Sequence, residues 1–89
     1  MKHFNDVKVG DTIFLLLYND EIQSNKVIEI DHRKYETRFW FYNDYKQRDY
    51  WFVYEEDLNK TYSAGVYSCI EAVLDAINND KINNDDEIF

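Results

Sequence analysis

The strongest constraint on the fold is an aromatic segment in the middle of the chain, RFWFYNDYKQRDYWFVY at residues 38–54. Aromatic residues fill more than half of its positions, in two runs separated by a polar stretch rich in turn-forming residues. Aromatic residues favour strands, and successive side chains of a strand point to opposite faces of its sheet. The segment therefore predicts a β-hairpin with strands at 35–42 and 50–54 and a polar connection at 43–49.

The alternation within this hairpin predicts which aromatic rings are buried. Phe39, Phe41 and Phe52 have apolar residues two positions away on the same strand. Large apolar side chains that share a strand face usually point into the core. We therefore expect these three rings to form part of the core.

The opposite face of the first hairpin strand carries the candidate binding residues. Arg38, Trp40 and Tyr42 share that face, where aromatic rings alternate with charge. Aromatic residues and arginine are enriched at the energetic centres of protein interfaces. These residues predict a protein-docking surface; the alternative is that cross-strand neighbours or a helix cover the rings.

Two further strands are expected before the hairpin, at residues 12–18 and 22–32. The first, TIFLLLY, is apolar on both faces, which is typical of a strand that is covered on each side. The second alternates, with Ile28 and Ile30 on one face and acidic residues on the other. Residues 61–67 are expected to form either a short closing strand or irregular chain.

The clearest helical signal lies near the C-terminal end. Ser68 and Glu71 have the spacing of a capping box, in which each side chain binds a backbone amide of the first turn. A single helical stripe is predicted for four apolar residues: Ile70, Val73, Leu74 and Ile77. We expect a helix over 69–80, followed by a mobile acidic tail at residues 83–89.

Four or five antiparallel strands followed by one amphipathic helix define a small α+β fold. A chain of 89 residues forms one domain, expected over residues 1–82 with its strands over 7–63. The VGDTIFLL start, the strand meander and the EEDL turn after the fourth strand resemble a small SH3-like barrel. That resemblance implies an antiparallel β-barrel, a fold that serves many different binding roles.

The whole chain also resembles the short, acidic, uncharacterised accessory proteins of T4-like tailed phages. The likeness rests on the pattern F-x-D-V-K-V-G-D at residues 4–11 and on the small helical segment at residues 68–77. It implies an accessory protein that acts in the host cytoplasm, and it transfers no catalytic residue.

The charge of the chain is strongly negative and unevenly distributed. The formal net charge is −8, and residues 49–89 carry two lysines against ten acidic residues. Such a field repels polyanions, so direct nucleic-acid binding is disfavoured. Acidic side chains spaced along one surface can also imitate the phosphates of DNA. The residues that would do so here are Glu55, Glu56, Asp57, Glu71 and Asp75, whose simpler interpretation is a solubilising surface.

Several classes of function lack their characteristic residues in this sequence. There is no Gly-x-Ser-x-Gly, no glycine-rich phosphate loop, no His-Glu-x-x-His and no dinucleotide fingerprint. The single cysteine, Cys69, forms no internal disulfide and suits a reducing cytosol. No apolar run reaches the length of about 20 residues that a membrane span needs. We expect a cytoplasmic protein with no enzymatic activity, no metal and no cofactor.

Two hypotheses of function remain. The first is a non-catalytic module that binds a protein partner, for example a host factor, through Arg38, Trp40 and Tyr42. The second is an acidic nucleic-acid mimic that inhibits a host defence nuclease of the anti-restriction or anti-CRISPR type. In either case the protein is expected to be a monomer or a homodimer formed through a sheet edge.

Overall fold

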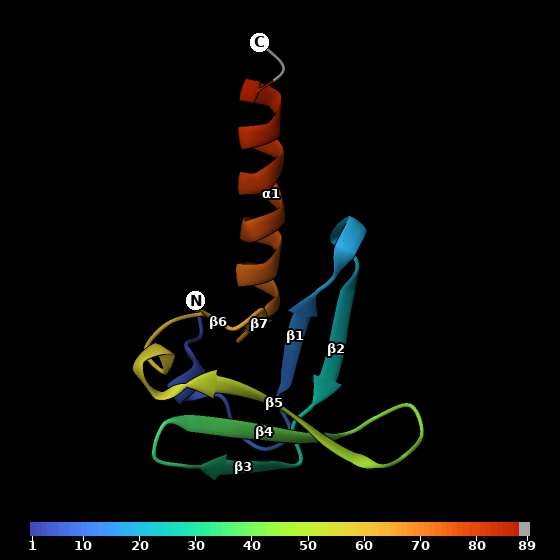
Figure 1. Cartoon of the computed structure of the whole chain (residues 1–89), viewed down its shortest axis with the longest axis vertical. Coiled ribbons are helices and arrows are strands. Elements are labelled where there is room, and N and C mark those ends of the chain that lie inside the picture. The colour runs from blue at the N-terminus through green and yellow to red at the C-terminus, as the bar shows by residue number, and fades with distance from the viewer. Residues whose placement is uncertain (88–89) are drawn as a thin grey trace.

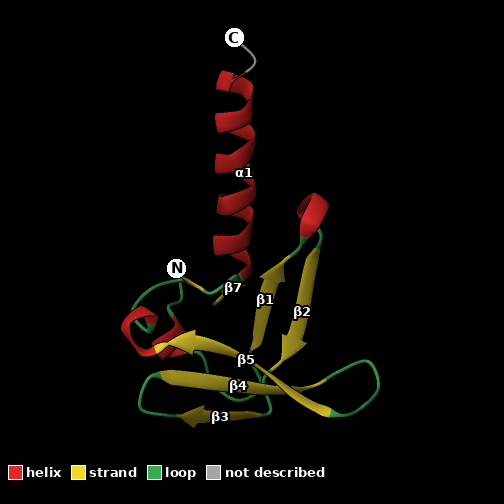
Figure 2. Ribbon diagram, in the orientation of Figure 1, coloured by secondary structure: helices red, strands yellow, loops and turns green. Residues whose placement is uncertain are grey.

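The computed structural model describes the backbone of residues 1–87 and the side chains of residues 1–80. It is an α+β domain with two antiparallel sheets, three short 3₁₀ turns (η) and one C-terminal helix (Figures 1 and 2). The elements in chain order are η1 (Phe4–Asp6), β1 (Thr12–Leu16), η2 (Tyr18–Asp20), β2 (Ile22–Lys26), β3 (Glu29–His32), β4 (Glu36–Tyr42), β5 (Arg48–Tyr54), η3 (Glu55–Asp57), β6 (Tyr62–Ser63), β7 (Val66–Tyr67) and α1 (Ile70–Glu87).

The strands form one sheet with the order β2-β1-β7-β6 and another with the order β3-β4-β5. Figure 1 shows β1 and β2 running steeply across the direction of β4 and β5. The predicted α+β class is therefore confirmed. Strand pairing does not close the two sheets into one barrel, so the expected SH3-like barrel is not established.

Residues 22–32 form two strands in different sheets and not the single strand expected. The chain passes from one sheet to the other at Val27 and Ile28. The Val27 amide donates to the Asp11 carbonyl at 2.8 Å, and the Ile28 amide donates to the Trp40 carbonyl at 2.8 Å. Both amides thus keep a partner although the strand is interrupted, and Val27 is only 1% exposed.

The predicted aromatic hairpin is confirmed as β4 and β5. Its ladder runs from the pair Glu36–Tyr54 to the pair Tyr42–Arg48. The connection, residues 43–47, is ordered by the side chain of its first residue, Asn43. The Oδ1 atom of Asn43 accepts hydrogen bonds from two amides of this loop, which is the usual role of asparagine in a turn.

The β6–β7 hairpin has a two-residue connection, Ala64-Gly65. Both residues have positive φ, 50° and 84°, as the turn type that matches strand twist requires. A side chain at Gly65 would also meet Leu15, with its Cβ 3.4 Å from Leu15 Cδ1. The sequence predicted either a short closing strand or irregular chain at residues 61–67, and the structure has a short hairpin of two strands there.

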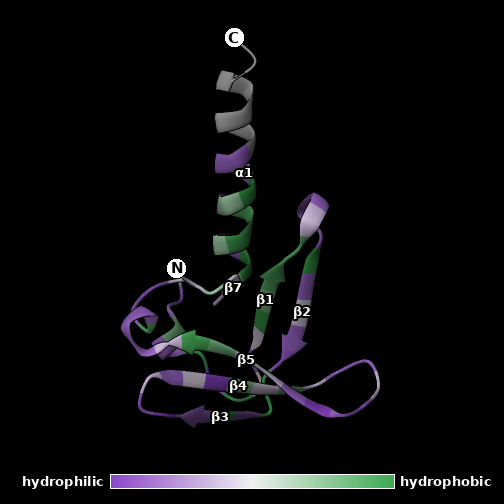
Figure 3. Cartoon of the chain, viewed as in Figure 1, coloured by the Kyte–Doolittle hydropathy of each residue, from purple (hydrophilic) through white to green (hydrophobic). Residues whose placement is uncertain are grey.

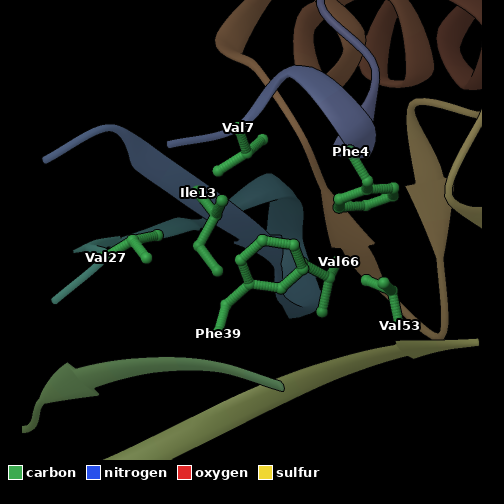
Figure 4. Packing of buried hydrophobic residues seen from close by; sticks show 7 residues of the cluster. All are labelled: Phe4, Val7, Ile13, Val27, Phe39, Val53 and Val66. Atoms are coloured by element: carbon green, nitrogen blue, oxygen red, sulfur yellow. The ribbon is translucent and has the colours of Figure 1, made fainter. Parts of the chain in front are cut away.

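The hydrophobic core lies between the two sheets and is closed by the N-terminal segment (Figure 4). Its buried members are Phe4, Val7, Ile13, Val27, Phe39, Val53 and Val66. The Phe4 and Phe39 rings lie 6.0 Å apart between centroids, so the first turn of the chain packs directly on β4. Leu58, which follows η3, also packs against this cluster.

Two of the three rings predicted to be buried are in the core, and the third is not. Phe39 and Phe41 are 1% and 4% exposed, whereas Phe52 is 36% exposed. On β5 the inward positions belong to Val53 and to Trp51, which pairs with Phe39. Because aromatic residues occupy three consecutive positions of β5, alternation alone does not fix which of them face the core.

Helix α1 begins near the predicted residue and ends later. It continues to Glu87, so residues 83–87, expected in a mobile tail, belong to the helix. Residues 88 and 89 lie outside the described residues. Among the described residues, no helix combines the length and the apolar character that a membrane span needs.

The face of α1 that packs on the sheet differs from the predicted stripe. Ala72 and Val73 are buried, whereas Ile70 and Leu74 are 39% and 48% exposed. The helix contacts β1 and β7 near its start and then rises away from both sheets (Figure 1). In the coloured part of α1, Figure 3 shows the apolar residues in the first turns. Because Ile70 and Leu74 stay exposed there, only a narrow face of these turns is covered.

Ser68, predicted to cap the helix, uses its hydroxyl differently. It donates to the carbonyl of Lys2 and lies 3.5 Å from the carbonyl of Thr61. These bonds tie the start of α1 to the N-terminal segment and to the strand before the β6–β7 turn.

Candidate functional site

The candidate site is the side of the β3-β4-β5 sheet that faces away from the core, here called the outer face. Alternation along the three strands and their pairing define its members. They are Glu29, Asp31, Glu36, Arg38, Trp40, Tyr42, Arg48, Tyr50, Phe52 and Tyr54.

Cross-strand contacts hold the rings of the outer face in place. The Trp40 and Tyr50 rings lie 4.8 Å apart between centroids. The Arg48 guanidinium carbon is 4.9 Å from the Trp40 centroid, and that of Arg38 is 4.3 Å from the Tyr50 centroid. Each such cation–π contact contributes about 0.5–1 kcal/mol at an exposed site, so the rings and guanidinium groups fix one another.

Both arginines of the outer face also bind carboxylates of this chain. Arg38 Nε donates to Glu36 at 2.8 Å, and Arg48 Nη2 donates to Glu29 at 2.8 Å. The hydrogen bond to Glu36 raises the pKa of Arg38, because it favours the charged guanidinium. Each arginine therefore lies between one ring and one carboxylate.

The structure brings the three predicted docking residues onto this face. Tyr42 is the most accessible, at 58% exposed. Trp40 is half-buried, and its indole Nε1 is buried with no hydrogen-bond acceptor among the described residues. The Arg38 side chain is 22% exposed.

The five acids of the predicted mimic surface lie on two different elements. Glu55, Glu56 and Asp57 form η3, whereas Glu71 and Asp75 belong to α1. Figure 1 shows η3 at one side of the domain and α1 rising from the middle of it. The structure therefore does not arrange all five acids in one row.

Asp57 is the half-buried member of these five acids, whereas the other four are exposed. It accepts from the Ser63 hydroxyl at 2.7 Å and from Lys60 Nζ at 3.0 Å. The bond from Ser63, followed by that from Lys60, holds the pKa of Asp57 below its ordinary value. Since Ser63 Oγ also accepts the Tyr54 amide at 3.1 Å, Asp57 links η3, β5 and β6.

An open pocket of about 570 Å³, which the sequence analysis did not predict, lies at the end of the outer face. Its lining residues are Tyr35, Tyr54, Glu55 and Glu56, and it is called here the tyrosine–glutamate pocket. Tyr35, the residue before β4, is 73% exposed. The Glu55 amide donates to the Tyr35 carbonyl at 3.1 Å, which joins the two chain segments that form the pocket.

The described residues also include the groups that could bind a metal ion or react as a thiol. Within them, no group of three or more His, Cys, Asp or Glu side chains is arranged to hold a metal ion. Cys69 is 8% exposed and packs at the start of α1. The pKa of Glu71 is lowered by a hydrogen bond from its own backbone amide and, second, by one from the Cys69 thiol.

Comparison of the chain with protein-family models, with curated proteins and with solved structures finds no match. The outer face and the tyrosine–glutamate pocket are thus the features from which function must be argued.

Proposed function

We propose that this protein is a non-catalytic module that binds a protein partner through its outer face, with Trp40 at the centre and Arg38 and Tyr42 beside it. The observation that carries the proposal is the set of rings and guanidinium groups fixed by cross-strand contacts. A surface that is already ordered loses little conformational entropy when a partner docks.

The finer interpretations from the sequence belong to the same proposal. They are an SH3-like barrel arrangement of the strands, a phage accessory protein, action in the host cytoplasm on a host factor, and the absence of enzymatic activity. Direct nucleic-acid binding is disfavoured because the net charge is −8 and both outer-face arginines already bind carboxylates. Strands β2 and β6 end one sheet and β3 and β5 end the other, so a homodimer would form through one of these edges.

The alternative is the acidic mimic. Glu55, Glu56, Glu71 and Asp75 favour it because all four are exposed and none forms an ion pair with another residue of the range 1–80. Their division between η3 and α1, and the role of Asp57 in linking strands, count against it. The mimic is therefore the second candidate.

The test is quantitative capture of the partner from a host-type lysate with three matched baits. These are the wild type, Trp40→Ala and Tyr18→Ala, the last removing a ring that is 92% exposed on the β1–β2 connection. We expect Trp40→Ala to reduce capture by about tenfold or more, as truncating a central interface residue does, and Tyr18→Ala to leave it unchanged. Because Trp40 is half-buried, circular dichroism checks the fold, and Tyr42→Ala provides a more exposed second variant.

Two outcomes would count against the outer face. Equal capture by the wild type and by both outer-face variants would mean that the partner binds elsewhere. A steep loss of capture between about 0.1 and 0.5 M salt, together with loss on neutralising Glu71 and Asp75, would favour the acidic mimic, because exposed charge pairs are screened by salt.

A further inference from the structure

We propose that the tyrosine–glutamate pocket receives an arginine side chain of the protein partner. The proposal rests on the function proposed above, since the pocket continues the outer face. Tyr54 belongs to both, and its ring lies 5.5 Å from that of Phe52 between centroids. A partner that covers Phe52 and Tyr54 would therefore reach the pocket.

The outer face itself shows how this fold holds a guanidinium group. Arg38 lies 4.3 Å from the Tyr50 centroid and 2.8 Å from a Glu36 oxygen. Arg48 lies 4.9 Å from the Trp40 centroid and 2.8 Å from a Glu29 oxygen. Each guanidinium thus has one aromatic ring and one carboxylate as neighbours.

The tyrosine–glutamate pocket offers the same two kinds of group, each of them twice. Its two rings are accessible, with Tyr35 73% and Tyr54 47% exposed. Its two carboxylates, Glu55 and Glu56, take part in no ion pair within residues 1–80. The pocket therefore has the partners of a guanidinium group without holding one.

The lysines nearest in sequence do not supply that positive charge. Lys60 is bound to Asp57 at 3.0 Å. Lys34 Nζ lies 5.2 Å from the Tyr35 centroid, which shows that this ring accepts a cation, but it forms no ion pair with Glu55 or Glu56. The pocket therefore keeps an excess of negative charge, which favours a cationic side chain of a partner.

Arginine fits these groups better than lysine does. Its planar guanidinium stacks on a ring while its fork of N–H donors binds carboxylates in a bidentate way. A lysine ammonium is a compact and strongly hydrated point charge that gains less from a ring beside two carboxylates in an open pocket.

The test uses N-acetyl-arginine amide as the probe and follows backbone amide shifts of the full chain by NMR. We expect saturable shifts at Tyr35 and at residues 54–56, with a dissociation constant on the order of 1 mM, as for a small fragment. N-acetyl-citrulline amide, which keeps the shape of the probe but lacks its charge, should bind about tenfold more weakly. The lysine probe, acetylated at its α-nitrogen and carrying a free ε-ammonium group, should also bind more weakly than the arginine probe.

Two double variants test the carboxylates at equal change of net charge. Glu55→Gln/Glu56→Gln should weaken binding of the arginine probe about tenfold, which corresponds to about 1.4 kcal/mol. Asp20→Asn/Glu21→Gln removes an equally exposed adjacent pair at the β1–β2 connection and should change it less than about twofold. Tyr54→Leu, which removes a ring, should weaken binding as well.

The proposal is overturned if the arginine probe causes no saturable shift at the pocket, if citrulline or lysine binds equally well, or if the two double variants behave alike. None of these measurements needs the natural partner. Failure of the pocket is thereby distinguished from failure of the proposed function, which the capture experiment with Trp40→Ala decides.

Discussion

Which face of strand β5 points into the core can be tested by two chemically identical substitutions, Phe39→Ala and Phe52→Ala. Each removes the same phenyl ring, from neighbouring strands of the same sheet. Phe39 is 1% exposed and packs on Phe4, whereas Phe52 is 36% exposed and faces away from the core. Alternation read from the sequence made the two rings equivalent, so the comparison separates that interpretation from the structure.

The expected costs differ because only one substitution leaves an enclosed cavity. Phe39→Ala should lower the free energy of unfolding by about 3–5 kcal/mol, the usual range for a phenylalanine in a closed core. Phe52→Ala leaves a depression open to water and should cost about 1 kcal/mol, the lost contact with the Tyr54 ring included. A chain of 89 residues has a total stability of about 4–13 kcal/mol, so Phe39→Ala removes a large part of it.

Urea unfolding followed by far-UV circular dichroism measures both values. With a slope of about 1 kcal/mol per molar urea for a small domain, the midpoints should fall by about 3 M or more and by about 1 M. If Phe39→Ala does not fold, Phe39→Leu should still cost more than Phe52→Leu. Equal losses for the two rings would show that β5 turns its other face to the core and would refute the reasoning.

Three further outcomes follow from the described contacts. Val73→Asp should cost several kcal/mol because Val73 is 0% exposed, whereas Leu74→Asp, at a position 48% exposed, should cost less than about 1 kcal/mol; thermal unfolding compares them. Ser63→Ala should cost about 1–3 kcal/mol by leaving the Tyr54 amide without its acceptor, and the pKa of Asp57, followed by carboxyl NMR, should rise toward its ordinary value. The pKa of Asp11 is lowered by its hydrogen bond from Lys2, and the pKa of Asp57 by its hydrogen bond from Ser63. Each carboxylate therefore contributes stability that is fully present above pH 3.8, its ordinary pKa, and is lost as the pH falls through the lowered pKa. An unfolding midpoint unchanged from pH 6 to about pH 2 would contradict this.

The sequence was sufficient for the hairpin because its signals agreed. Two aromatic runs flank a polar stretch that begins with Asn43, and the structure has a hairpin there, although β5 begins at Arg48, two residues earlier than predicted. The alternation on β4 also placed Phe39 inside and Trp40 on the opposite face, because Trp40 shares its face with the charged residues Glu36 and Arg38. In the predicted β5 strand, residues 50–54, neither face carries a charged residue, so the burial of Phe52 was predicted wrongly.

The helix and the strand before the hairpin depended on tertiary contacts that no local pattern contains. The predicted apolar stripe would be buried if α1 lay along a sheet. The helix instead contacts β1 and β7 near its start, so Leu74 stays exposed. No glycine or proline near Val27 indicates a bend in the sequence. The bend arises because the amides of Val27 and Ile28 form hydrogen bonds with different sheets of the fold.

The tyrosine–glutamate pocket was missed because it joins the two ends of the hairpin. Tyr35 precedes β4, whereas Glu55 and Glu56 follow β5. The sequence signal for the pocket is a tyrosine followed by glutamate at each end of the hairpin, YE at 35–36 and the doublet YE at 54–55, extended by Glu56. Only the exact strand register, which pairs Glu36 with Tyr54, shows that the two doublets meet.

The two tryptophans lie on opposite sides of one three-stranded sheet. Trp40 stands on the outer face beside Arg48, whereas Trp51 packs against the core. Indole emission responds to its immediate surroundings, so the two residues form separate optical reporters within a single chain. With Trp51→Phe the fluorescence would come from the outer face alone, and with Trp40→Phe from the interior alone. Quenching by a bound molecule and loss of the native fold can thereby be recorded as independent signals without any attached dye.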